Sequence, residues 1–134
     1  MFGENLILGD GYGKIDSKNR IFVPAFTKVE PQEQLLIQLI EINYELAFKI
    51  TAIHKYFKII ERFQKLRDNA TSLDSFEKYD KEIELVCQKL DFIINVDKQK
   101  RLQIPHNLMT KLGWSNKNEI HFTGLGESLL VRKK

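Results

Sequence analysis

The feature that most constrains this chain is a ten-residue segment that occurs twice. The first copy, IDSKNRIFVP, spans residues 15–24, and the second, VDKQKRLQIP, spans residues 96–105. The aspartate, the arginine and the proline are identical in both copies, at an offset of 81 residues (16 to 97). Three aliphatic pairs keep the same register: Ile15/Val96, Ile21/Leu102 and Val23/Ile104. The pattern predicts a strand, a polar loop and a second strand ended by proline, written twice.

The residues that follow each copy agree too, which argues against a chance match. After Pro105, the run His106–Leu112 predicts a short helix, because proline suits a first helical turn and Gly113 suits a left-handed stop. After Pro24 the helix must be shorter, because Pro31 blocks its continuation. Each copy therefore predicts a β-loop-helix unit.

Strand-like sequence comes after each predicted helix. Residues Ile40–Ile50 alternate apolar with mostly polar side chains, and we expect a turn near Asn43. In the second unit, Glu119–Thr123 and Ser128–Arg132 flank the sequence GLGE, which is typical of a hairpin turn. Both units thus end in strands.

Between the copies, the segments Thr51–Asp68 and Asp74–Leu90 predict two antiparallel helices joined by a turn at 69–72. Apolar residues recur at helical spacing in both: Ile53, Phe57, Ile60, Phe63 and Leu66 in the first, and Phe76, Tyr79, Ile83, Val86, Cys87 and Leu90 in the second. We expect these stripes to form core or a subunit interface rather than a cofactor site. Cys87 is expected to be a small buried hydrophobe.

The order of these elements predicts an α+β fold with an internal pseudo-two-fold repeat. The first unit spans residues 1–50, the helical hairpin residues 51–92, and the second unit residues 93–134. Units of about 50 residues are marginally stable alone. We therefore expect the two to pack on each other, as one compact domain, or on other subunits.

Charge is distributed unevenly along the 134 residues. Residues 1–50 carry 5 basic and 7 acidic side chains, whereas residues 93–134 carry 8 basic and 3 acidic ones. A positive excess in the last third is compatible with an anionic partner such as nucleic acid. It is equally compatible with a solvated surface that ends in a basic tail.

Several functional classes lack their sequence signals. The three histidines are scattered and Cys87 is the one cysteine, so no zinc-ligand spacing or intrachain disulfide arises. There is no phosphate-binding glycine loop and no nucleophile elbow. No secretory signal or membrane-spanning run is visible. We expect a cytoplasmic protein without cofactor, metal, membrane partner or small-molecule substrate, and not an enzyme.

The repeated loop holds an acid and a base close together. In the functional interpretation, Arg20 and Arg101 present guanidinium forks to phosphates or guanine edges, while Asp16 and Asp97 brace the turn. Four lysines add phosphate-neutralising charge: Lys14, Lys18, Lys98 and Lys100. In the structural interpretation, each pair is a salt bridge across a strand turn, worth about 0.2–1 kcal/mol if exposed. Two copies with flanking lysines give both interpretations similar weight.

The two segments resemble the paired D-x-x-G-R-[aliphatic]-x-[aliphatic]-P loops of the MraZ family, which belongs to the SpoVT/AbrB swapped-hairpin group. The Met1-Phe2-Gly3 start, the central helical pair and the closing run from Ile120 to Gly126 also occur in the order of that family. The resemblance covers nearly the whole chain. Its motifs are short, and their duplication and spacing carry most of its weight.

The resemblance implies two AbrB-like units forming a β-rich barrel, assembled into a ring-shaped homo-oligomer. It also implies a nucleoid-associated, autoregulatory repressor that binds repeated double-stranded DNA sites upstream of a division and cell-wall gene cluster. A ring would present many loops at once, so weak contacts would add. Residues at the family's DNA-contacting positions are Lys18, Asn19, Arg20, Lys98, Lys100 and Arg101, with Pro24 and Pro105 closing the loops.

The chain departs from the family where Asn19 and Lys100 replace the glycine before each arginine. If that position needs a positive φ, asparagine tolerates it and lysine does so much less readily. The second loop could then have changed its turn or its task. Two alternatives stay open: an AbrB-type antitoxin that also binds a partner protein through the helical hairpin, and a ring-forming adaptor that has lost DNA binding.

Overall fold

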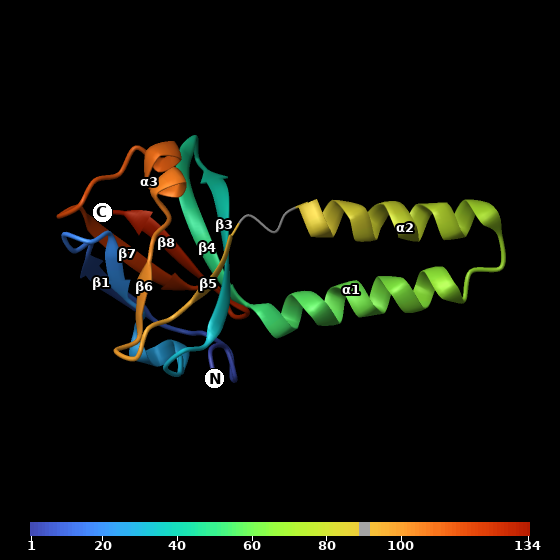
Figure 1. The fold of residues 1–134 in the computed structure, drawn as a ribbon, viewed down its shortest axis with the longest axis horizontal. Helices are drawn as coiled ribbons and strands as arrows, with labels where there is room; N and C mark the ends of the chain where they lie inside the picture. Colours follow the sequence, from blue (N-terminus) through green and yellow to red (C-terminus); the bar gives the residue numbers. More distant parts are fainter. Residues whose placement is uncertain (89–91) are drawn as a thin grey trace.

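The computed structural model describes residues 1–88 and 92–134 and has an α+β architecture. A β body, residues 1–52 and 92–134, carries a helical hairpin that projects from one end (Figure 1). The elements are β1 (Asp10–Lys14), β2 (Arg20–Phe22), the 3-10 helix η1 (Ala25–Thr27), β3 (Gln34–Ile42), β4 (Glu45–Ala52), α1 (Ile53–Asp68), α2 (Leu73–Gln88), β5 (Phe92–Asn95), β6 (Arg101–Gln103), α3 (His106–Leu112), β7 (Glu119–Gly124) and β8 (Ser128–Lys133).

Six strands form one antiparallel sheet in the order β1-β7-β8-β4-β3-β5, and β2 pairs with β6 in a separate ribbon. The strand before each aspartate loop joins the other half of the chain, because β1 pairs with β7 and β5 pairs with β3. Over the described residues the sheet does not close into the expected barrel. Closure would need ladder hydrogen bonds from the edge strands to the ribbon, and the three-residue strands β2 and β6 pair with each other instead.

The core lies between the six-stranded sheet and the β2–β6 ribbon. On the inner face, Phe48 of β4 stands opposite Val131 of β8, which stands opposite Phe122 of β7. All three are buried, and Ile21 and Leu102 of the ribbon belong to the same apolar cluster. The period-two alternation of each strand therefore turns one ribbon face inward and leaves the other for solvent.

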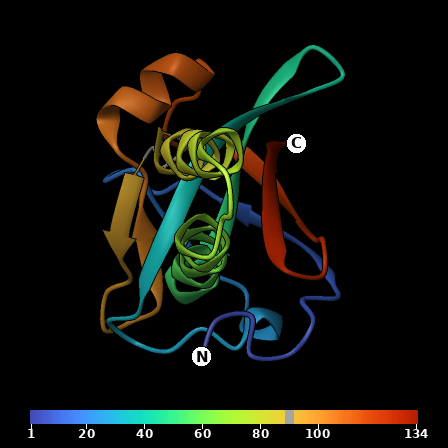
Figure 2. The ribbon, with the colours of Figure 1, turned by 90° about the vertical axis from the view of Figure 1, so that its right-hand side faces the viewer.

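Local turn signals predicted several elements correctly. The helix α3 spans His106–Leu112 and ends at Gly113, whose φ is +70°. After Pro24 the chain forms only the short η1. The expected turn near Asn43 is a two-residue connection in which Asn43 and Tyr44 both have positive φ, as a type I′ hairpin requires. The extended β3–β4 arm stands out in Figure 2.

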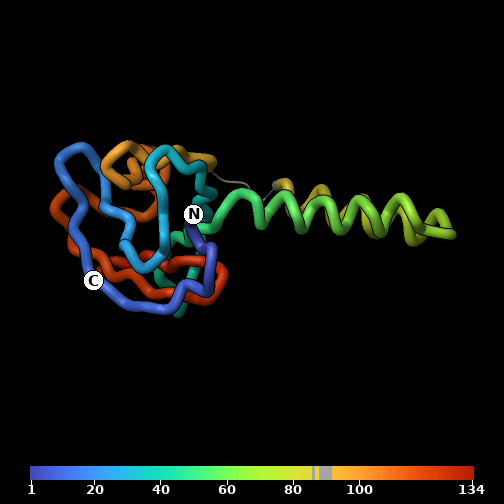
Figure 3. The backbone as a smooth tube through the Cα atoms, turned by 90° about the horizontal axis from the view of Figure 1, so that it is seen from below, coloured from blue at the N-terminus to red at the C-terminus, as the bar shows by residue number. Residues whose placement is uncertain are grey.

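The helical hairpin differs from its prediction at the start of α1 and at Cys87. Helix α1 begins at Ile53, not Thr51, because Thr51 and Ala52 are paired in β4 with β3. The stripe residues of α1 are not core, since none of its side chains is buried. Cys87 is exposed rather than buried, because α2 also projects away from the body (Figure 3). The predicted end of α2, Leu90, lies outside the described residues.

Candidate nucleic-acid interface

The first aspartate loop is closed by a ring of hydrogen bonds. The Oδ1 atom of Asp16 accepts the backbone N–H of Lys18 at 2.9 Å and that of Arg20 at 2.8 Å. Its Oδ2 atom accepts Nε–H of Arg20 at 2.8 Å. The backbone of Asn19 donates to the carbonyl of Asp16 at 3.0 Å. The aspartate thus braces the turn and fixes the arginine at the same time.

The second loop repeats this arrangement atom by atom. Asp97 Oδ1 accepts the backbone N–H of Gln99 at 2.8 Å and that of Arg101 at 2.9 Å, and Oδ2 accepts Arg101 Nε–H at 2.8 Å. Lys100 has the same left-handed backbone as Asn19, with φ values of +63° and +59°. The two loops therefore make the same turn, and Lys100 occupies a conformation that suits glycine better.

The β2–β6 ribbon places the loops beside each other. Ile21 pairs with Leu102 at its centre. The ladder continues symmetrically into the loops: the N–H of Val23 donates to the carbonyl of Lys100 at 3.0 Å, and that of Ile104 donates to the carbonyl of Asn19 at 2.8 Å. Each loop therefore accepts a backbone hydrogen bond from the residue that follows the ribbon strand of the other loop.

Two prolines fix where each loop ends. Pro24 and Pro105 have nearly the same backbone angles, with φ of −58° and −57° and ψ of 142° in both. Each precedes a helix and accepts a backbone hydrogen bond from its first turn, from Thr27 at 3.1 Å and from Met109 at 3.0 Å. The chain therefore leaves both loops in the same direction relative to the ribbon strands.

The outward face of the ribbon carries the two arginines and two residues that the sequence interpretation missed. Alternation turns Arg20 and Phe22 outward from β2, and Arg101 and Gln103 outward from β6. Phe22 is 66% exposed, and the guanidinium carbon of Arg101 lies 6.0 Å from the centre of its ring, within cation–π range. Their spacing of two residues from the arginines predicts a shared strand face, but it does not show that this face points outward.

Each guanidinium uses Nε to bind its aspartate. In the described part of the chain, the terminal nitrogens of Arg20 and Arg101 have no hydrogen-bond or ion-pair partner on the protein. A fork of donors held by its Nε is a fixed recognition group for a phosphate or a base edge.

Exposed lysines surround this face. Lys18, Lys98 and Lys100 lie in the loops, and Lys14 lies at the end of β1 just before the first loop. With the arginines and aspartates included, residues 14–20 and residues 95–101 each carry three basic and one acidic side chain, a net charge of +2 per loop. The two loop segments that the ribbon brings together therefore carry a combined net charge of +4.

Both aspartates are held ionised. Partial burial of Asp16 opposes its charge, but backbone N–H groups of Arg20 and Lys18 and the guanidinium outweigh this, so the pKa of Asp16 lies below its usual value. For Asp97, the backbone N–H of Arg101 is the largest cause, and it lowers the pKa against a smaller burial effect. A carboxylate that accepts several N–H groups is stabilised in its charged form.

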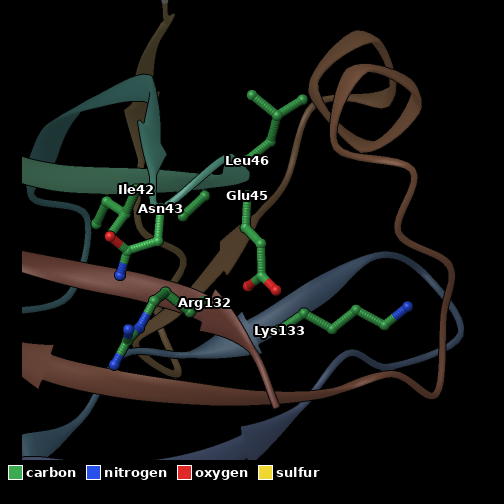
Figure 4. Close-up of a pocket in the computed structure, with 7 residues that line it drawn as sticks. Ile42, Asn43, Glu45, Leu46, Arg132 and Lys133 are labelled. Carbon is green, nitrogen blue, oxygen red and sulfur yellow. The ribbon is translucent and has the colours of Figure 1, made fainter.

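Other sites are less developed. A pocket of about 170 Å³ lies between the β3–β4 turn and β8, lined among others by Glu45, Arg132 and Lys133 (Figure 4). It is smaller than the roughly 300–1,000 Å³ of typical ligand sites. Within residues 1–88 and 92–134, no three His, Cys, Asp or Glu side chains gather as metal ligands.

Compared with protein-family models and with curated proteins, the chain matches none of them. No helix in the described ranges is long and apolar enough to cross a membrane.

Proposed function

We propose that this protein is a sequence-specific DNA-binding transcriptional regulator that contacts DNA through the β2–β6 ribbon and its two loops. The observation that carries the proposal is the duplicated Asp–Arg clamp: two fixed guanidinium forks stand on one ribbon face within a cluster of net charge +4. A two-stranded β-ribbon has dimensions that fit the major groove. Each clamp has two lysines beside it in the sequence, at positions that differ between the two loops.

In this mechanism the side chains have separate tasks. Lys14, Lys18, Lys98 and Lys100 neutralise phosphates and set the register of the protein on the duplex. Arg20 and Arg101 read guanine edges or clamp phosphates through their free terminal nitrogens. Asn19 and Gln103 add amide groups that recognise adenine in the same groove, and Phe22 offers an apolar contact to a thymine methyl group.

The proposal extends to the architecture. The two loops belong to two swapped-hairpin units of a MraZ-like tandem repeat, in which strands β1 and β5 have exchanged partners between the units. By this likeness the protein is an autoregulatory, nucleoid-associated repressor that works as a ring-shaped homo-oligomer. Repetition of a weakly binding ribbon in an oligomer raises the effective concentration of each next contact, which suits repeated sites in the DNA.

The arginines provide the test. Replacing either Arg20 or Arg101 by alanine should weaken binding to the DNA upstream of the protein's own gene by about 1–3 kcal/mol, roughly 5- to 150-fold, measured by fluorescence anisotropy. The matched control is Arg132→Ala, which removes an arginine of β8 that is not on the ribbon. Circular dichroism confirms that each variant is folded. Equal affinity of the folded ribbon variants and the control would refute the proposal.

A further inference from the structure

The helical hairpin exposes apolar surface that the rest of the described chain leaves uncovered. Helix α1 buries none of its side chains, and the two helices extend from the β body into solvent (Figures 1 and 3). Six large apolar residues of the hairpin are each at least 40% exposed: Phe57, Ile59, Leu66, Leu73, Phe76 and Leu85. Helices of this length gain most of their stability from packing an apolar face. The hairpin therefore lacks part of its packing.

The two helices carry opposite charge. Helix α1 has five basic and two acidic residues, a net charge of +3, and α2 has two basic and five acidic residues, a net charge of −3. Three exposed residues form a basic edge on α1: Lys58, Arg62 and Lys65. Three exposed residues form an acidic edge on α2: Glu77, Asp80 and Glu84.

The two edges have the same spacing when the helices are read in opposite directions. Along α1 the basic residues are separated by four and then three positions, and along α2 the acidic residues, taken from Glu84 back to Glu77, are also separated by four and then three. At a rise of about 1.5 Å per residue, an antiparallel α1 and α2 bring all three pairs to equal heights. Each basic residue would then face one acidic residue.

These pairs are not made inside one hairpin. The side of α1 that meets α2 carries the half-buried Ile60, Phe63 and Arg67, and Arg67 Nη1 binds Asp80 Oδ1 at 2.8 Å. Among the described residues, the basic edge makes no ion pair with α2. It lines a shallow groove of about 410 Å³ together with Leu66, so apolar surface adjoins the charges.

We propose that the hairpin is the self-association surface of this protein, with the basic edge of α1 in one copy packed antiparallel against the acidic edge of α2 in a second copy. From helical spacing, the two half-sites lie on the outer sides of α1 and α2. Figure 2 views the two helices along their axes. When the basic edge of one copy contacts the acidic edge of the next, the copies join in a row. All β bodies then lie at the same end of the helices. In this register Leu66 lies at the height of Phe76 of the neighbour, and Ile59 lies close to the height of its Leu85.

A second copy is the occupant that this surface specifies, because the chain itself supplies both complementary edges in matching order. An unrelated partner would need only one of them. The inference is independent of DNA binding, and its test contains no DNA.

The test is a charge swap in the full chain, followed by sedimentation velocity over a concentration series. The basic-edge variant is Lys58→Glu/Lys65→Glu, and the acidic-edge variant is Glu77→Lys/Glu84→Lys, which leaves the Arg67–Asp80 ion pair intact. We expect the wild type to associate and each variant to have a dissociation constant at least tenfold higher. The control, Lys111→Glu/Lys133→Glu, makes the same charge change on the β body and should associate like the wild type.

An equimolar mixture of the two variants decides between charge pairing and a general loss of structure. In the mixture, a reversed edge meets a reversed edge of opposite sign and a native edge meets a native one, and in a chain with all four substitutions reversed edges meet each other, so association should return. A wild-type protein that stays monomeric, or association that survives both single-edge variants, would overturn the proposal. If the mixture does not associate although circular dichroism shows that both variants are folded, the proposed charge pairing is overturned as well.

Discussion

Lys100 occupies a backbone conformation that suits glycine, and this gives a sharp test of the loop geometry. Its φ of +63° lies in the left-handed region, where a side chain with a Cβ atom costs roughly 1–2 kcal/mol. Glycine avoids this cost but loses about 0.5–1 kcal/mol more backbone entropy on folding. Lys100→Gly should therefore raise the free energy of unfolding by about 0.5–1 kcal/mol.

Lys100→Ala is the matched comparison, because it removes the same lysine side chain and keeps the Cβ atom. In a helix or strand, a protein with glycine is less stable than the same protein with alanine. At position 100 the order should reverse, with the Lys100→Gly variant more stable than the Lys100→Ala variant by about 1 kcal/mol. For a chain of 134 residues that corresponds to a difference in Tm of about 3–5 °C. Urea unfolding followed by circular dichroism measures it.

The reasoning fails if alanine at position 100 is as stable as glycine or more stable, since residue 100 would then not be held in the left-handed region. Both variants also lose one predicted phosphate contact. They should therefore lower the steepness of the salt dependence of DNA binding by about 0.9 in log–log form, equally in the two cases.

Three further substitutions test other parts of the structure. Gly124→Ala would place a Cβ atom against the carbonyl oxygen of Ile7, so the backbone must shift, and thermal unfolding should show a loss of at least about 2 kcal/mol. Leu102→Ala empties a fully buried position under the ribbon and should cost about 2–5 kcal/mol in urea unfolding. Because the folded pKa values of Asp16 and Asp97 are lowered, both stabilise the protein above the unfolded value of about 3.9. This contribution is lost as the pH falls through the folded pKa, so the stability gap between the wild type and Asp16→Asn/Asp97→Asn should narrow below about pH 4.

Elements fixed by local signals were predictable from the sequence. The helix after Pro105 ends at Gly113 because glycine adopts the left-handed stop without strain. The Asp–Arg clamp is also local, since Asp97 reaches groups only two and four residues away. Its repetition in the structure follows from repetition in the sequence.

Elements fixed by distant contacts were not predictable. Alternation along β1 shows which side chains share a face, but it does not show that the strand pairs with β7 rather than with its own unit. Thr51 continues a helical pattern in the sequence, yet pairing with β3 keeps it in strand β4. Helical periodicity placed Cys87 on an apolar face without showing that its side chain stays exposed in the structure.

The charged residues of the candidate site were predictable from the sequence, and the outward position of its apolar residue, Phe22, was not. Arg20 and Arg101 were evident from the repeat, whereas Phe22 emerged only when β2 was seen to turn the same face outward at positions 20 and 22. A large exposed aromatic beside two arginines is not distinguishable from a core residue by hydropathy alone.

Fluorescence anisotropy over a salt series, with DNA from upstream of the protein's own gene and a scrambled duplex of equal length, tests DNA recognition by the ribbon most directly. The four lysines around the ribbon predict that the logarithm of the binding constant falls with the logarithm of salt concentration at a slope of up to about −3.6 per chain. The account predicts this steep dependence together with tighter binding to the upstream DNA. A folded protein that shows no preference for that DNA, or binding that does not respond to salt, would contradict it.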